Sequence, residues 1–454
     1  MRVPLANPTP YGQQLREITE RLEKSQWWSV DLMQRFQFDQ LNRLVAHAYE
    51  TVPFHRERLA AAGYRPRQAI TPEFWRSLPR LRRSDLQDQG DALRSTSVPA
   101  EHGGSFRLGT SGSTAMPVSI WRTQLQAQIL AAVVLRKLLW QSCDLRLKFG
   151  VIERDPTGAS FAPAGRRFAN WGAAAQAYQT GPSVMLDNRS SIAEMADWLL
   201  REKPDYLRVP PALLKALSFH FLDRGLDPPH LKAIMSGGAL IGPDLREVVR
   251  RAFRRDLFAS YGAVEAGTIA LQCPEHQHYH VQAEATLVEV LDGRGDLSAP
   301  GETGTVVITP LQGYASPLIR YEIGDRAVLG AACSCGRSQP VLRDVVGRMR
   351  DLFVLPSGER RFCNFGGLAF YQLSDLRQCQ IVQRSRYDLE VRLVVRRRLT
   401  PEVEAEVAQR IKAATSQHFS IRMTYHDSIP LTPAGKFQDF VCEVEAAQAL
   451  GAEP

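Results

Sequence analysis

The chain has no long hydrophobic run. Its longest uncharged apolar stretch, at 129–135, is far too short to cross a bilayer, and residues 1–8 lack the apolar core of a signal peptide. Cysteine is scarce: an odd total of seven in 454 residues argues against a disulfide framework. We therefore expect a cytoplasmic protein with reduced thiols and no contact with a membrane.

The chain also lacks any concentrated stretch of charge of one sign. The formal net charge of +8 is spread over segments of mixed sign, and no basic stripe is interleaved with aromatic residues. This pattern disfavours nucleic-acid binding, so we expect no nucleic-acid partner, and the positive charge suits anionic small molecules or an acidic protein. With 44% hydrophobic and 23% charged residues, the composition is globular, and the length suggests about two or three domains.

A loop rich in glycine and hydroxyl side chains lies at 107–117, before a strand-like segment at 118–121. Gly109 and Gly112 let backbone N–H groups converge, and the hydroxyls add donors suited to phosphate oxygens. The hydroxyl residues are Thr110, Ser111, Ser113 and Thr114. The loop lacks the Gly-Lys-Ser/Thr ending of the common P-loop, and an ordinary surface loop is the alternative interpretation.

The middle of the chain alternates between strand and helix patterns, which predicts an α/β multidomain fold. After a helical pattern from Leu15 to about Leu59, broken at Pro53, the expected helices are 124–140, 192–201, 212–222 and 243–253, and the expected strands are 149–152, 206–209, 231–235 and a segment from 256.

Beyond residue 281 the sequence pattern becomes typical of β-strands. Strands are expected at 286–291 and 304–309, within a β-subdomain that extends to about residue 327. After residue 348 a small α+β unit is expected. Its strands are predicted at 352–355, 389–395 and 422–426, and its helix at 401–419.

Residues with chemical potential follow several of these strands. The double glycine of Ser236 to Ala239 allows a flat ligand to approach the backbone, Tyr261 is suited to stacking on a base, and Glu265 is suited to a hard cation. A plain tight turn is the alternative interpretation of the double glycine. Asp325, expected in a Gly-Asp turn, is suited to a ribose diol, with Arg348 as a nearby donor.

Five motifs stand in order along the chain: Thr-Ser-Gly-Ser-Thr at 110–114, Ser-Gly-Gly-Ala at 236–239, Tyr-Gly-Ala-Val-Glu-Ala-Gly at 261–267, Arg-Tyr-Glu-Ile-Gly-Asp at 320–325 with Gly-Arg-Met-Arg-Asp at 347–351, and Pro-Leu-Thr-Pro-Ala-Gly-Lys at 430–436. This set resembles the adenylate-forming superfamily of acyl-CoA synthetases and peptide-synthetase adenylation domains. The short helical part at 41–64 and the compact C-terminal part resemble the phenylacetate-CoA ligase branch. The resemblance implies a large N-terminal adenylation (AMP-binding) domain, 1–347, and a small mobile C-terminal domain, 348–454.

The resemblance also implies a role for each motif. Phosphate contacts fall on Thr110, Ser111, Gly112, Ser113 and Thr114, and contacts to the adenine on Gly237, Gly238, Ala239, Tyr261 and Gly262. Glu265 would bind Mg²⁺, and Asp325 and Arg348 would bind the ribose. Lys436, Glu265 and Thr110 are the implied catalytic residues, with Lys436 stabilising the transition state at the α-phosphate.

Two positions depart from the family pattern. Ala115 stands where the family loop usually continues with glycine, and no lysine precedes Pro117. Arg350 fills the hinge position that is usually acidic. The resemblance implies that the C-terminal domain turns near Arg350 and Asp351 after adenylation, so that one active site serves two half-reactions.

Cysteine and histidine are concentrated in two short stretches, 273–280 and 333–335. Tetrahedral zinc sites are commonly built from two such pairs, which predicts a structural Zn²⁺ that staples a β-subdomain at about 270–340. Cys273, Cys333 and Cys335 supply three ligands. His276 has the common Cys-x2-His spacing, whereas His280 opens a strand and matches the histidine of zinc-bearing members of the branch. We favour His280.

The leading functional hypothesis is ATP-dependent activation of a small aromatic carboxylic acid as an acyl-adenylate, with transfer to coenzyme A or to the phosphopantetheine of a carrier protein. One alternative sends the acyl group to an amine or a protein, and another is a nucleotide-binding scaffold without catalysis. We see no carrier motif between Lys436 and Pro454, so we expect any carrier protein to be a separate chain. A homodimer is compatible with the sequence.

Overall fold

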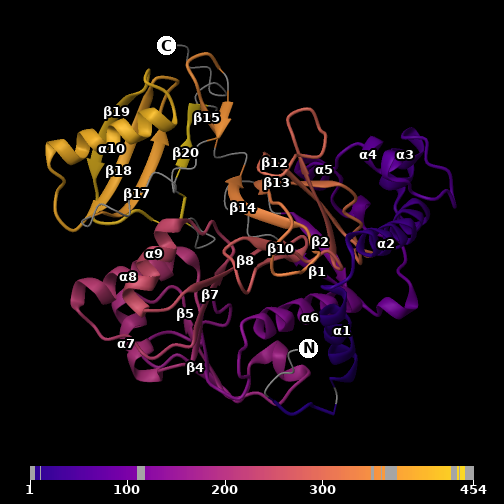
Figure 1. Ribbon diagram of the computed structural model, residues 1–454, viewed down its shortest axis with the longest axis horizontal. Helices are drawn as coiled ribbons and strands as arrows, with labels where there is room; N and C mark the ends of the chain where they lie inside the picture. Colours follow the sequence, from indigo (N-terminus) through magenta and orange to yellow (C-terminus); the bar gives the residue numbers. More distant parts are fainter. Residues whose placement is uncertain are drawn as a thin grey trace. The chain divides into compact units, whose positions relative to one another are not determined.

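The computed structural model describes residues 6–10, 12–109, 118–348, 352–358, 360–362, 376–430, 437–438 and 440–444 (Figure 1). The chain divides into two compact units. The first comprises residues 1–149, 167–183 and 259–345, and the second comprises 150–166, 184–258 and 346–454. Both units combine helices with strands, which confirms the expected α/β class. The domain boundary at residue 347 stays a prediction.

Helices of the first unit begin where the sequence offers a cap. Ser29 accepts a hydrogen bond from the N–H of Leu32, and Thr123 accepts one from the N–H of Gln126. The helical pattern expected from Leu15 to Leu59 is interrupted at 26–29 as well as at Pro53. The helices are α1 (Gln13–Ser25), α2 (Val30–Thr51), α3 (Pro53–Ala61), α4 (Pro72–Ser77), α5 (Arg83–Gln89) and α6 (Gln124–Trp140), with short 3₁₀ turns at Gly90–Leu93, Ala100–His102 and Gly172–Gln176.

The strands of the first unit pair mostly in the antiparallel sense. They are β1 (Ser105–Gly109), β2 (Ser119–Thr123), β8 (Leu257–Ala263), β9 (Gly267–Gln272), β10 (Tyr279–Val281), β11 (Thr286–Leu291), β12 (Thr303–Pro310), β13 (Tyr321–Leu329) and β14 (Val341–Arg348). Strands β1 and β2 form a hairpin, and the others follow the order β11-β12-β13-β14-β10-β9-β8. Leu41, Val45 and Trp75 pack with Leu311 and Ile319 in a buried cluster, which ties the helices to this sheet.

In the second unit, strands alternate with helices. Strands β3 (Phe149–Glu153), β5 (Ser183–Asp187), β6 (Tyr206–Arg208) and β7 (Ala233–Gly237) follow the order β7-β6-β3-β5, with β4 (Arg166–Phe168) beside β5. Helices α7 (Ile192–Glu202), α8 (Pro211–Arg224) and α9 (Pro243–Phe253) pack in sequence against one another (Figure 1). Because β6 and β7 run parallel, their carboxyl ends lie at one edge of the sheet.

The C-terminal part of the second unit is a four-stranded sheet covered by one helix (Figure 1). Its strands are β17 (Leu376–Gln383), β18 (Asp388–Val395), β19 (Ser420–Tyr425) and β20 (Phe440–Cys442), its helix is α10 (Pro401–Ala414), and the hairpin β15 (Leu352–Val354) and β16 (Arg360–Phe362) precedes them. Val407 and Ile411 of α10 pack against Ile381 and Val391 of the sheet. This is the small α+β unit that the sequence predicts.

Within the part of the chain that the structure describes, we find no helix that is both long enough and apolar enough to pass through a membrane.

Candidate active site and metal centre

The hydroxyl-rich loop, with Thr110, Ser111, Gly112, Ser113 and Thr114, lies outside the described residues, as does Ala115. The residues on either side of the loop are described. Gly109 of β1 pairs with Ser119 of β2, so the segment connects two antiparallel strands. Its predicted phosphate contacts stay a prediction.

Tyr261 and Asp325 come from separate motifs and lie side by side in the first unit. Tyr261 lies within β8, and its Oη donates a hydrogen bond of 2.7 Å to Asp325 Oδ2. Asp325 lies within strand β13, not in the tight turn expected from its Gly-Asp sequence. Both side chains predicted to contact a nucleoside are therefore held at one place.

A bulge in β13 explains the position of Asp325. Thr305 pairs with Arg326 and Val307 pairs with Glu322, so the three residues 323–325 stand opposite one residue of β12. Gly324 has φ +85°, which is in the left-handed region and is adopted easily only by glycine. The Gly-Asp sequence therefore produces a local bulge within strand β13 in place of the expected turn.

Glu265 lies in the turn between β8 and β9, directly after the strand as the sequence predicts. Its carboxylate is buried and lies 3.5 Å from Nη1 of Arg83, which belongs to α5. Arg122 of β2 holds the same turn by donating a 2.7 Å hydrogen bond to the Val264 carbonyl. Burial lowers the pKa of Arg122 from its usual value. The turn is thus bordered by two guanidinium groups from distant elements.

Gly262 permits the close approach of β8 and β9 at this turn. A Cβ at Gly262 would lie 2.5 Å from the carbonyl oxygen of Gly267, so a larger residue would force the strands apart. Gly267 itself has φ +73°. These two glycines shape the hairpin that carries Glu265.

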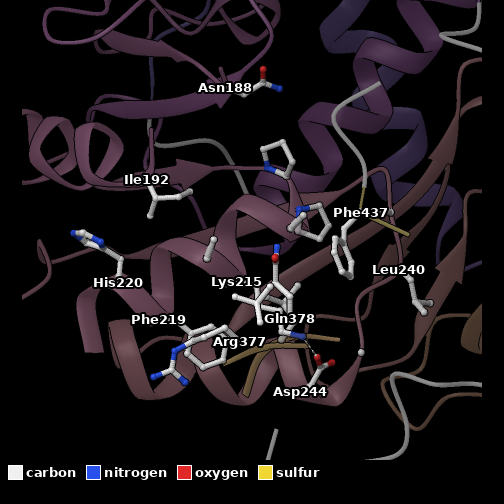
Figure 2. A pocket seen from close by; sticks show the side chains of 18 of the residues that line it. Asn188, Ile192, Lys215, Phe219, His220, Leu240, Asp244, Arg377, Gln378 and Phe437 are labelled. Carbon is white, nitrogen blue, oxygen red and sulfur yellow. Dashed lines mark hydrogen bonds and ion pairs between the residues drawn. The ribbon is translucent and has the colours of Figure 1, made fainter. Parts of the chain in front are cut away.

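A cavity of about 580 Å³ lies in the second unit at the carboxyl ends of β6 and β7 (Figure 2). Gly237, Gly238 and Ala239, which the sequence predicts to frame an adenine, line it. Leu240 and Phe437 add apolar surface. Ligands of open α/β sheets bind at such strand ends, and the cavity volume falls in the range of small-molecule sites.

Charged side chains are also present in this cavity. Lys215 of α8 forms a 2.6 Å ion pair with Asp244 of α9, which Figure 2 shows as a dashed line. Arg377 of β17 lies against the ring of Phe219, 4.6 Å from its centroid. The cavity thus combines apolar walls with cationic groups at its rim.

Two predicted ligand-binding residues, Arg348 and Lys436, lie partly or wholly outside the described residues. Arg348 is the last residue of β14, and its side chain is outside the described part of the structure, as are Arg350 and Asp351. Lys436 also lies outside the described residues. Its neighbour Phe437 is described and lines the cavity next to the double glycine.

The predicted metal ligands lie together in the first unit. The ligand atoms of Cys273, His280, Cys333 and Cys335 all lie within 4.8 Å of one another. Cys273 Sγ is 3.9 Å from Cys333 Sγ, and Cys335 Sγ is 3.3 Å from His280 Nε2. With Zn–S bonds of about 2.3 Å, the edge of a tetrahedral site is about 3.8 Å. The spacing of the four side chains is therefore compatible with tetrahedral coordination of one metal ion.

The neighbouring histidines take other positions. His276 is exposed, and its Nε2 lies 2.9 Å from Ser334 Oγ, away from the cluster. His278, which the sequence analysis did not single out, places Nε2 3.1 Å from Cys333 Sγ. The geometry thus favours His280 over His276, in agreement with the order of preference drawn from the sequence.

Burial shifts the pKa of His280 and of Cys333, whereas hydrogen bonds outweigh burial at Cys335 and lower the pKa of that thiol. Burial lowers the pKa of His280 to about 4, so the imidazole is neutral near pH 7, as metal binding requires. The same effect raises the pKa of the Cys333 thiol to about 12. A thiolate at this place therefore needs a nearby cation, which a bound metal ion would supply. His280 Nδ1 lies 3.4 Å from the Gln339 carbonyl, which orients the ring.

Comparison with known proteins places the chain in a family. The sequence profile of the family described as "AMP-binding enzyme" matches residues 71–312, more than half of the chain. The chain therefore belongs to the AMP-binding enzyme family, and the resemblance to the adenylate-forming superfamily is confirmed.

Individual relatives specify the branch. The phenylacetate-coenzyme A ligase of Thermus thermophilus is 26% identical over 333 residues, which cover 71% of this chain and 72% of the relative. The enzyme of the same name from Pseudomonas putida is 25% identical over 336 residues, covering 72% and 73%. The crystal structure of 2-hydroxyisobutyryl-CoA ligase in the postadenylation state matches with TM-score 0.72 and 19% identity, over 91% of this chain and 90% of that one. These matches agree with the expected phenylacetate-CoA ligase-like branch and fold.

Some residues near these sites have no signal in the sequence. Arg83 is one of several arginines in a polar segment, and only the fold brings it to Glu265. The ion pair between Asp223 of α8 and Arg377 of β17 joins residues 154 positions apart. Neither belongs to a motif, so spacing alone could not have identified them.

Proposed function

We propose that this chain is an ATP-dependent, AMP-forming acid:thiol ligase that activates a small aromatic carboxylic acid and transfers it to coenzyme A. The family membership and the names of the curated relatives support this proposal. The observation that carries it is the hydrogen bond between Tyr261 and Asp325, because it brings together two residues 64 positions apart that belong to separate motifs predicted to contact the nucleotide.

In the first half-reaction, an oxygen of the acid attacks the α-phosphorus of ATP, an acyl-phosphate bond forms, and pyrophosphate leaves. Asp325 would accept hydrogen bonds from the ribose hydroxyls while Tyr261 stacks on the base. Gly237 to Ala239 would border the adenine in the cavity described above. Lys436 would offset the charge that builds on the phosphate oxygens.

In the second half-reaction, the thiol sulfur attacks the acyl carbonyl, the thioester forms, AMP leaves and the thiol proton is released. Repulsion between the acid and ATP dominates the first step but not the second, so Lys436 is needed chiefly for adenylation. A turn of the C-terminal part at Arg350 and Asp351 would then admit the thiol.

Two metal ions complete the proposal. Glu265 would hold Mg²⁺, which neutralises phosphate charge when bound. Cys273, His280, Cys333 and Cys335 would hold a structural Zn²⁺, since four ligands leave no open position for a substrate. The cytoplasmic location, the homodimer and a carrier-protein acceptor stay predictions from the sequence.

Incubation of the protein with ATP, Mg²⁺ and a panel of phenylacetates, benzoates, fatty acids and amino acids tests the proposal, with coenzyme A present or omitted. We expect one aromatic acid to give AMP together with a coenzyme A thioester detected by mass spectrometry. A carrier protein and simple amines replace coenzyme A in parallel reactions. Thioester on the carrier alone, or an amide alone, would overturn the choice of acceptor; no acid-dependent AMP would overturn the function.

A further inference from the structure

An ion pair links the helical and C-terminal parts of the second unit. Arg377 donates from Nε to Asp223 Oδ2 over 3.0 Å and from Nη2 to Asp223 Oδ1 over 2.6 Å. Arg396 adds a third nitrogen, 3.9 Å from the same carboxylate. We call Asp223 and Arg377 the clamp.

The clamp has two features of an ion pair that can hold α8 and β17 in a fixed relative position. It is bidentate, and the Arg377 side chain is only 14% exposed. Phe219, one helical turn before Asp223, covers the guanidinium, as Figure 2 shows. Solvent therefore screens this pair less than the exposed pair of Asp227 with Arg254, whose side chains are 89% and 81% exposed.

The strand that carries Arg377 also holds both flanks of the segment that contains Lys436. Gln378 Oε1 accepts a 3.0 Å hydrogen bond from the N–H of Ile429, before the segment. Gln380 Nε2 donates a 2.9 Å hydrogen bond to the carbonyl of Gln438, after it. Three residues near the start of β17 therefore connect α8 to both flanks.

The clamp and the predicted nucleotide contacts border one cavity. Asp223 and Arg377 line it together with Gly237 and Gly238, and so does Phe437, which directly follows Lys436 in the chain. In this arrangement the backbone next to the lysine lies at the wall predicted to face adenine. The clamp thus borders the same cavity as the described residue that follows Lys436 in the chain.

We propose that Asp223 is a positioning residue for adenylation: by binding Arg377, it aligns β17, and with it the flanks of the Lys436 segment, against the nucleotide cavity. This inference rests on the proposed function. Asp223 touches neither the acid nor ATP, and it acts through Arg377. Thioester transfer, which does not need Lys436 at the phosphate, does not need the clamp.

Separate assays of the two half-reactions test this role. The first is acid-dependent exchange of pyrophosphate into ATP, and the second is thioester formation from a chemically prepared acyl-adenylate and coenzyme A. In Asp223→Asn, which loses the charge of the pair, we expect the kcat of exchange to fall by about tenfold, with an unchanged KM for ATP. The rate of the second assay is expected to stay unchanged.

Two further variants separate positioning from general stability. Asp223→Glu keeps a carboxylate that can bind Arg377 and should retain most of the exchange rate that Asp223→Asn loses. Asp227→Asn removes the same charge just beyond α8 and should leave both assays unchanged.

Normal exchange in Asp223→Asn, an equal loss in both half-reactions, or the same loss of exchange in Asp223→Glu as in Asp223→Asn would overturn the role of the clamp. Failure of the proposed function itself has a different signature. In that case the unaltered protein would catalyse neither half-reaction with any acid, whereas failure of this inference alone leaves the unaltered protein active.

Discussion

Tyr261 and Asp325 are joined by a 2.7 Å hydrogen bond in which the phenol donates to the carboxylate, although they belong to different strands and different motifs. The bond fixes the position of one carboxylate oxygen of Asp325. Asp325 directly follows Gly324, whose positive φ lies within the irregular part of the β12–β13 pairing. The two side chains thus form a preorganised pair.

Replacing Tyr261 by phenylalanine tests this preorganisation. The ring is kept, but the Asp325 carboxylate loses a donor and gains rotational freedom. We expect the KM for ATP to rise by about tenfold or more, since one hydrogen bond to a charged group contributes roughly 1.5–3 kcal/mol. Steady-state kinetics measures the change. Tyr387→Phe, at an exposed position, is the control, and an unaltered KM in Tyr261→Phe would contradict the assignment.

Substitution of Glu265 by glutamine tests the proposed Mg²⁺ site. The amide is nearly isosteric but uncharged, so it binds a hard cation more weakly. We expect the Mg²⁺ concentration for half-maximal activity to rise by about tenfold or more. Magnesium titrations of the ATP-dependent reaction give this value, and Glu57→Gln, on the exposed surface of α3, serves as control. A normal Mg²⁺ requirement in Glu265→Gln would exclude this carboxylate as the ligand.

Periodic segments were predicted well from sequence. The helices expected at 124–140 and 243–253 match α6 and α9 residue for residue, because apolar spacing, Thr123 as a cap and Pro243 at the first turn all point to the same bounds. Strand β17 was not predicted. The apolar residues Leu376, Cys379 and Ile381 do not alternate regularly with polar ones in its sequence. The pairing of β17 with β18 also contains a register shift between Leu376 and Gln378.

The sequence predicted some parts of the candidate sites better than others. The metal cluster could be anticipated, because cysteine and histidine at close spacing have few other uses. Asp325 was expected in a turn, since Gly-Asp is typical of turns, and only pairing with β12 reveals a bulged strand. Contacts such as Arg83 with Glu265 depend on how distant elements pack, which local patterns do not encode.

Removal of the metal tests the Cys/His cluster. We expect about one zinc per chain by elemental analysis, and its loss with a strong chelator should lower the melting temperature by roughly 5–10 °C. Cys333→Ser should reduce the zinc content, whereas His276→Ala should not, because His276 contacts Ser334 instead. Equal zinc loss in both variants would contradict the ligand set, and protein free of zinc with normal stability would exclude a structural ion.

His55 predicts a dependence of stability on pH. It is fully buried, its Nε2 donates a 2.7 Å hydrogen bond to the Pro317 carbonyl, and Nδ1 has no hydrogen-bond partner among the residues that the structure describes. Burial, with the nearby charge of Arg58, lowers its pKa to about 3. The unfolded chain therefore takes up this proton first, so the contribution to stability is complete above about pH 6.5 and is lost as pH falls towards 3.

Urea unfolding at several pH values measures this contribution. Between about pH 6 and 4 we expect His55→Gln to reduce the slope of the unfolding free energy by up to about 1.4 kcal/mol per pH unit. His418→Gln, at an exposed position, should leave the slope unchanged. A slope in His55→Gln equal to that of the unaltered protein would show that His55 is not the titrating group.

The most direct test of the central claim is acid-dependent exchange of radiolabelled pyrophosphate into ATP, measured for the unaltered protein and for Lys436→Ala. An adenylate-forming enzyme should catalyse exchange with one class of aromatic acid. The variant should lose exchange by about 100-fold or more while retaining ATP binding. Exchange that is absent with every acid although ATP binds, or exchange that is unchanged in Lys436→Ala, would contradict the account.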